Sequence, residues 1–170
     1  QVSSGSTLGD TFGDDALAAI AETTGRYTLV LRRMPPTEKS GPYSLTVDAL
    51  RPARPADTVC IEAATAFARG VIERRNGQSA SVRALDAFVA ALARFRQVAD
   101  RRGELRALLQ VGVLQSDLGQ PEALATAREA ERLAAELDSQ PARALALGIA
   151  GRALDRAGDL LGALRYHEEA

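Results

Sequence analysis

Three pairs of glycines, each spaced seven residues apart, constrain the fold of this chain more than any other feature. The pairs are Gly70/Gly77, Gly112/Gly119 and Gly151/Gly158. Each is followed by an alanine pair at the same spacing, beginning at Ala84, Ala123 and Ala163. Residues seven apart return to nearly the same face of an α-helix, so each pair predicts close contact along one helical stripe. Comparable glycines recur after 42 and then 39 residues, which predicts a two-helix unit repeated three times, as in an α-solenoid.

The amino-acid composition limits which kinds of partner and which location are expected for this chain. Among 170 residues, 21 basic and 22 acidic side chains give a net charge of −1, a balance that favours neither nucleic acid nor an anionic membrane. We find no apolar run of about 18 residues and therefore expect no membrane span. Cys60 is the sole cysteine, so no internal disulfide can form. The chain opens without Met and ends inside an amphipathic segment, which indicates a fragment; the lack of a signal peptide favours the cytoplasm but leaves the compartment open.

The N-terminal third reads as β-structure. Residues 1–10 are rich in Gly and Ser, and we expect them to be flexible. A β module is predicted over residues 11–52, because Tyr27, Leu29 and Leu31 alternate with polar or smaller neighbours and a similar run follows residue 42. The turn-rich residues 34–42 would close a hairpin. Strands are expected near 16–22, 26–33 and 42–50, although the alanines of 16–22 also favour a helix.

Everything after the two-proline link at 51–56 reads as helix. Apolar residues keep the spacing of amphipathic helices, and the connections are short enough to make neighbouring helices antiparallel. Asp57 and Asp159 are the expected N-caps, and Gly103 is an expected C-terminal stop. We predict repeats over 57–100, 104–138 and 141–170. The fold class is therefore α+β: an antiparallel hairpin or partial sandwich followed by an all-α, right-handed solenoid of three helix pairs.

The repeat motifs resemble the tetratricopeptide pattern, in which a Leu-Gly falls in the first helix and an Ala-x3-Phe in the second. Val111-Gly112 meets the first motif, and Ala84 with Phe88 meets the second. "GRYTLVL" and "GPYSLTV", followed by "LGQPEAL" and "AGDLLGAL", resemble bacterial CHAT-domain tetratricopeptide proteins. That resemblance implies a β-sandwich of the pre-peptidase C-terminal type before the repeats and a caspase-like domain beyond them. The family's catalytic His and Cys belong to that downstream domain, and nothing here matches them.

The inventory of reactive side chains argues against an enzyme. Cys60 and His167 are the one cysteine and the one histidine, and they lie at opposite ends of the predicted array. One of each cannot build a tetrahedral metal site, and the glycines lack the Lys-Ser/Thr partner of a phosphate loop. We expect no catalytic residues, no metal and no cofactor.

The inner groove is the remaining candidate site. First helices of successive repeats line the concave face of such arrays, and the stripe beside each glycine pair also carries Ser116 and Gly148. The predicted partner-binding residues are Arg74, Arg75, Arg106, Leu109, Val113, Asp117, Arg152, Asp155 and Arg156. Mixed charges and apolar groups suit an extended peptide, so we expect a protein or peptide partner, recruited or sensed for a downstream effector. The alternative is an architectural spacer or an oligomerisation module that pairs through its exposed last helix.

Overall fold

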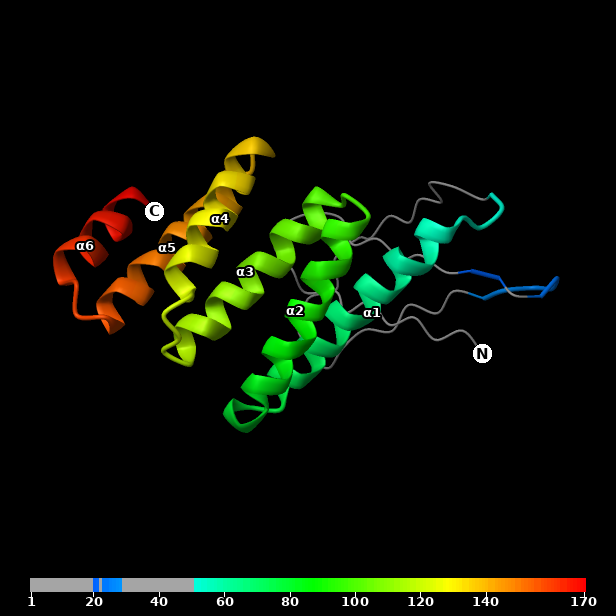
Figure 1. Ribbon diagram of the computed structural model, residues 1–170, viewed down its shortest axis with the longest axis horizontal. Helices are drawn as coiled ribbons and strands as arrows, with labels where there is room; N and C mark the ends of the chain where they lie inside the picture. The colour runs from blue at the N-terminus through cyan, green and yellow to red at the C-terminus, as the bar shows by residue number, and fades with distance from the viewer. Residues whose placement is uncertain (1–19, 22, 29–50) are drawn as a thin grey trace, which may run out of the picture.

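The chain after residue 50 folds as a row of helices. The computed structural model describes residues 20–21, 23–28 and 51–170, and the described elements appear in order in Figure 1. They are α1 (Pro55–Arg75), the short 3-10 turn η1 (Gln78–Ala80), α2 (Ser81–Gln97), α3 (Arg101–Asp117), α4 (Ala123–Glu136), α5 (Gln140–Arg156) and α6 (Leu160–Glu169). The predicted number of helices after residue 57 is thus confirmed.

The predicted α+β class is wrong for the described part of the chain, because every element there is helical and none is a strand. Of the expected strand near 26–33, only residues 26–28 are described, and they are not in a strand. Most of 16–22, all of 42–50 and the flexible segment 1–10 lie outside the described residues.

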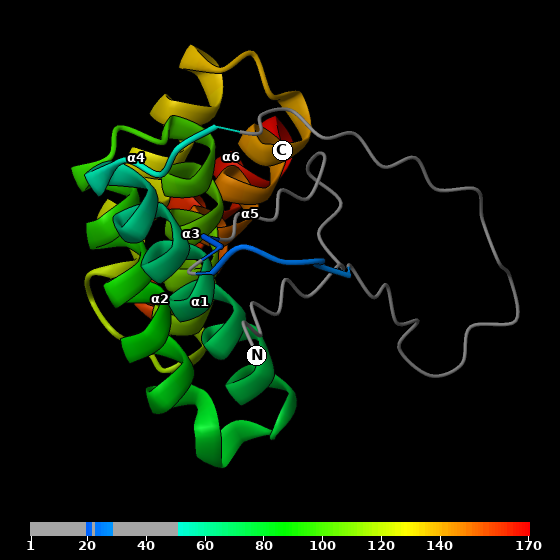
Figure 2. The ribbon, with the colours of Figure 1, turned by 90° about the vertical axis from the view of Figure 1, so that its right-hand side faces the viewer.

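Each helix packs against the next one in the chain, and α3 also packs against α5. Figure 1 shows α1 and α6 at opposite ends of the row, and in Figure 2 α1 and α2 stand in front of α5 and α6. Contacts between sequence neighbours, with first helices of successive pairs side by side, are typical of stacked repeats. The described part is therefore a helical-repeat-like arrangement consistent with a solenoid.

The first glycine of each pair lies at a helix contact, as predicted. A Cβ on Gly70 would stand 2.7 Å from the ring of Phe88, one on Gly112 would stand 3.3 Å from Ile149, and one on Gly151 would stand 2.7 Å from His167. Phe88 and Ile149 are fully buried. A side chain larger than hydrogen would therefore force these neighbours apart or make them turn.

The second glycine of each pair does not continue the helix contact. Gly77, Gly119 and Gly158 have φ values of 85°, 69° and 84°, and a Cβ on any of them would meet no described residue within 4 Å. They lie in the turns that end α1, α3 and α5, where a left-handed residue commonly terminates a helix. The seven-residue spacing thus joins one packing position to one helix end.

The turns between pairs use the same geometry without glycine. Ala99 and Asp138, at φ 55° and 52°, end α2 and α4. The amide of Asp100 donates to the carbonyl of Phe95 at 2.9 Å, and the amide of Ala99 donates to Arg96 at 3.1 Å. This pair of bonds defines a Schellman motif, which recurs at the ends of α3, α4 and α5.

Two of the three predicted helix signals are wrong in detail. Gly103 lies in the first turn of α3 rather than at a helix end, and its amide donates to the side chain of Asp100 at 2.9 Å. Asp57 is the third residue of α1, because Pro55 already begins the helix; its carboxylate accepts from the amide of Arg54 at 2.7 Å. Asp159 is confirmed as an N-cap, since it accepts from the amide of Gly162 at 2.9 Å.

Asp57 also forms an ion pair with Arg51, at 2.7 Å. The hydrogen bond from Arg51, followed by that from the backbone of Arg54, lowers the pKa of Asp57 to about 2. The two-proline link is thereby fastened to the first turn of α1.

Candidate interaction surface

The structure divides the nine predicted partner-binding residues into three groups. Leu109 and Val113 belong to the buried core, at 2% and 9% exposure, so they do not lie on an open surface. Arg106 is half-buried. The remaining six are exposed: Arg74, Arg75, Asp117, Arg152, Asp155 and Arg156.

Two of the predicted arginines take part in the contact between α1 and α3. The guanidinium carbon of Arg106 lies 4.9 Å from the centroid of the Phe67 ring, a cation–π contact. Arg74 donates through Nη1 to the side-chain oxygen of Gln110. These side chains therefore help to hold the first helices together.

The C-terminal half of α5 differs, because both of its arginines are exposed. Arg152 and Arg156 are one helical turn apart and exposed, and neither makes an ion pair or hydrogen bond among the residues that the structure describes. Gly148 continues the same stripe, and a Cβ there would meet no atom of the described residues within 4 Å. The C-terminal half of α5 thus exposes two arginines, Arg152 and Arg156, together with Asp155.

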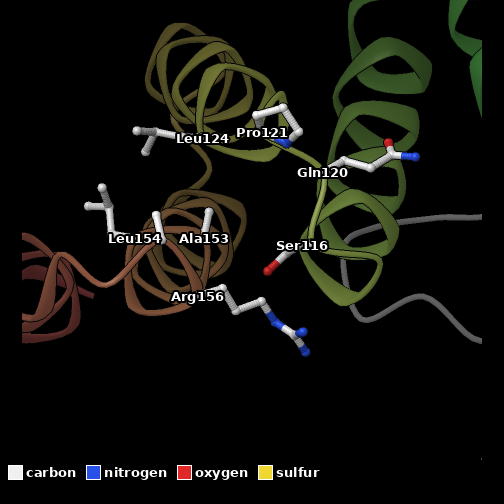
Figure 3. Close-up of a pocket in the computed structure, with 9 residues that line it drawn as sticks. Ser116, Gln120, Pro121, Leu124, Ala153, Leu154 and Arg156 are labelled. Atoms are coloured by element: carbon white, nitrogen blue, oxygen red, sulfur yellow. The ribbon is translucent and has the colours of Figure 1, made fainter.

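A hollow of about 440 Å³ adjoins this stretch. It lies between the turn that joins α3 to α4 and the C-terminal half of α5, as Figure 3 shows. Its apolar lining includes Pro121, Leu124, Ala153, Leu154 and Ala157. Small-molecule and peptide side-chain sites have this mostly apolar character, with a few polar groups that fix orientation.

Ser116 is the most unusual residue of the lining. It is 1% exposed, and its hydroxyl has no hydrogen-bond partner among the residues that the structure describes. In Figure 3 this hydroxyl points from α3 toward α5, and the side chain of Arg156 extends from α5 toward α3. A buried hydroxyl without a partner costs about 1–3 kcal/mol, so it is a group that favours an incoming acceptor.

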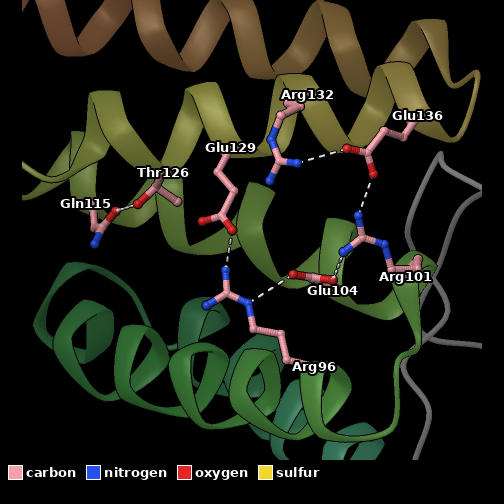
Figure 4. Close-up of polar contacts among 8 residues, drawn as sticks. All are labelled: Arg96, Arg101, Glu104, Gln115, Thr126, Glu129, Arg132 and Glu136. Atoms are coloured by element: carbon pink, nitrogen blue, oxygen red, sulfur yellow. Dashed lines mark hydrogen bonds and ion pairs between the residues drawn. The ribbon is translucent and has the colours of Figure 1, made fainter.

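A network of ion pairs lies elsewhere and joins three helices (Figure 4). The carboxylate of Glu104, which is 7% exposed, accepts from Arg96 of α2 at 2.9 Å and from Arg101 of its own helix at 2.8 Å. Arg96 also pairs with Glu129 of α4 at 2.6 Å, and Arg101 pairs with Glu136. Because every charge in this network has a partner, we assign it to stabilising the stack.

The acidic partners also raise the pKa values of the arginines in this network. Burial lowers the pKa of Arg96, but the hydrogen bond to Glu104 and the attraction of Glu129 outweigh it, and the net pKa is raised. The pKa of Arg101 is raised chiefly by its hydrogen bond to Glu136. Both side chains therefore stay charged.

The structure does not bring the one cysteine and the one histidine together. Cys60 lies in α1 and His167 in α6, at opposite ends of the row in Figure 1. Burial, followed by the charges of Asp100 and Asp57, raises the pKa of the Cys60 thiol, which leaves less of the reactive thiolate at neutral pH. Within residues 20–21, 23–28 and 51–170, no three His, Cys, Asp or Glu side chains are grouped so that they could hold a metal ion.

None of the described helices combines the length and the apolar character that crossing a lipid bilayer requires. Comparisons with models of protein families, with characterised proteins and with solved structures found no match to this chain. The arrangement of the helices alone therefore defines the class, which is helical-repeat-like.

Sequence reasoning missed the hollow itself. It placed Ser116 on the groove-facing stripe of one helix and Arg152 and Arg156 on that of the next first helix, but it gave Pro121, Leu124 and Leu154 no binding role. The 39-residue period could have indicated the position of the hollow, because it places the turn after α3 beside the end of α5. The depth of a hollow depends on how side chains of different helices meet, and a spacing pattern does not contain that information.

Proposed function

We propose that this chain is a non-catalytic interaction scaffold of the tetratricopeptide kind, which binds an acidic segment of a protein partner along α5. The observation that carries the proposal is the pair Arg152 and Arg156, exposed, one turn apart and without partners among the described residues. Arginine binds carboxylates through paired hydrogen bonds, and it does so most strongly when its donors are not already used. The resemblance to CHAT-domain proteins extends the proposal: the partner is recruited or sensed for a downstream effector.

A selection from a display library of random peptides tests the proposal. We expect the wild-type chain to enrich sequences that contain Asp or Glu, and the double variant R152E/R156E to lose those sequences. The matched control is R102E/R165E, because Arg102 and Arg165 are also exposed arginines without partners among the described residues and the change in net charge is the same. Equal enrichment by both double variants would remove α5 as the binding face.

The second candidate is an oligomerisation module or spacer, and one observation favours it. Leu160, Leu161 and Leu164 of α6 are 67%, 74% and 54% exposed. Large apolar side chains grouped on one helix end mark a contact surface. Light scattering after size exclusion tests this: a dimer that becomes monomeric when the three leucines are changed to Gln supports the module. Val82 and Val89 of α2, exposed at 58% and 47%, provide the matched control substitutions.

A further inference from the structure

We propose that the hollow beside α5 is a binding subsite for an aliphatic group that carries a carboxylate. The inference deepens the proposed function and rests on it for the biological source of the ligand, which would be a segment of the partner protein. The hollow, the buried hydroxyl of Ser116 and the guanidinium of Arg156 determine the chemistry of the ligand.

The apolar part of the ligand follows from the walls. Pro121, Leu124, Ala153 and Leu154 present hydrocarbon to a space of about 440 Å³, enough for a branched aliphatic side chain and the backbone atoms beside it. Burying such a group removes apolar surface from water, and this supplies most of the affinity of a small site. An entirely polar ligand would leave these walls without a partner.

The carboxylate follows from the charge of the lining. Of the nine described residues that line the hollow, Arg156 alone is charged, and it has no other partner among them. Asp117, Glu122 and Asp155 are the acidic residues next to lining residues along the chain, and none of the three lines the hollow. A carboxylate placed there would pair with Arg156 while its second oxygen accepts from another donor.

Ser116 supplies that second donor. A serine within a helix can bond to the carbonyl four residues earlier, yet this hydroxyl has no partner in the described part of the chain and lies at 1% exposure. At the equivalent place in the next repeat, 39 residues on, the residue is Asp155, which is exposed. The buried hydroxyl is therefore particular to the hollow and not a feature of the repeat.

The test uses N-acetyl-leucine as the probe and N-acetyl-leucinamide as its uncharged match. We expect the acid to shift the backbone amide resonances of Gly119, Ala153 and Ala157 in a titration followed by NMR, with millimolar affinity. The amide should bind about tenfold more weakly, since it lacks the charge-assisted bonds. Two peptides with acetylated N-termini identify the source of the carboxylate: one has an internal Leu-Glu and an amidated C-terminus, and the other ends in leucine with a free C-terminal carboxylate.

Two variants assign the donors. R156Q should weaken binding of N-acetyl-leucine about tenfold and leave the fold intact, because the side chain is exposed and unpartnered among the described residues. S116A should weaken it about threefold to tenfold while the melting temperature stays level or rises, since the change removes an unsatisfied hydroxyl. R102Q is the control and should bind as the wild type does. Unchanged affinity in R156Q and S116A, or no shift of these amides by the acid, would overturn the subsite.

The two proposals can fail separately. Enriched peptides whose binding ignores R156Q and S116A would leave the scaffold standing and remove the subsite. Binding of N-acetyl-leucine in the hollow without enrichment of any peptide would keep the subsite and remove the scaffold.

Discussion

The helices α3 and α5 occupy the same place in successive repeats, yet the C-terminal half of α3 is more enclosed than that of α5. Between Gly103 and Ser116 every residue of α3 is buried or half-buried. On α5, 39 residues further on, the stripe that contains Arg152, Asp155 and Arg156 is exposed. The two helices therefore have the same position in the repeat but differ in which side chains they expose to solvent.

Between α3 and α5, the glycines that determine backbone geometry are the same, whereas the side chains of the inner stripe differ. Gly112 and Gly151 both lie at helix contacts, and Gly119 and Gly158 both end a helix. In contrast, Val113 corresponds to Arg152 and is buried where Arg152 is exposed. We infer that the repeat preserves the backbone geometry while the side chains of the inner stripe are free to specialise, as α-solenoids require.

The sharpest test of this comparison is a pair of charge reversals at one position of the repeat. Glu104 of α3 corresponds to Arg143 of α5, which pairs with Glu131 at 3.5 Å and Glu169 at 3.2 Å. E104R places three arginines together at a 7% exposed site and should cost about 3 kcal/mol of unfolding free energy. R143E acts at a site exposed by 37% and should cost about 1 kcal/mol or less.

Urea denaturation measures both free energies. E104Q, which keeps the volume and removes the charge, separates electrostatics from packing. Equal losses in E104R and R143E would mean that enclosure of α3 has no energetic consequence, and the comparison would fail.

Glycine-to-alanine substitutions extend the comparison to all three repeats. G70A should cost about 1–3 kcal/mol, because its Cβ would lie 2.7 Å from the ring of Phe88, which is fully buried and cannot turn away. G151A meets the exposed imidazole of His167 and should gain up to about 1 kcal/mol from the helix propensity of alanine.

The central repeat should fall between these two. G112A places its Cβ 3.3 Å from Ile149, which needs an adjustment of a few tenths of an ångström, so we expect a change within about 1 kcal/mol. G112L would push into fully buried Ile149 and should be clearly destabilising. Thermal melts of the four variants give the order, and a G151A loss as large as that of G70A would contradict it.

The sequence period predicted correctly where the helices contact one another, but it did not predict which side chains are exposed. The small residues Gly70, Gly112 and Gly151 predicted helix contacts because only small side chains permit close approach. The burial of Leu109 and Val113 could not be predicted from residue spacing, because it depends on how closely the neighbouring helices pack against α3. The strands expected at 42–50 stay untested, because they lie outside the described residues.

Helix starts give a smaller test of the same two helices. Asp100 caps α3 by accepting from the amide of Gly103, whereas Ser139 stands at the start of α5 without a side-chain bond. D100A should therefore cost about 1 kcal/mol, and S139A a few tenths at most. Urea denaturation measures the free energy of unfolding of both variants. If S139A loses as much stability as D100A, then Ser139 caps α5 as effectively as Asp100 caps α3, and the comparison is wrong.

The turns that end the helices provide a further comparison with similarly small effects. Ala99 and Asp138 both hold positive φ, at 55° and 52°, which is unfavourable for a residue with a Cβ. Asp tolerates this region better than Ala, so A99G should stabilise the chain by about 0.5–1 kcal/mol and D138G by less. The reverse change G119A, at φ 69°, should destabilise by about 1 kcal/mol. Denaturation curves for the three variants should follow this order, and a loss of stability in A99G would show that the turn after α2 is held by something other than its backbone geometry.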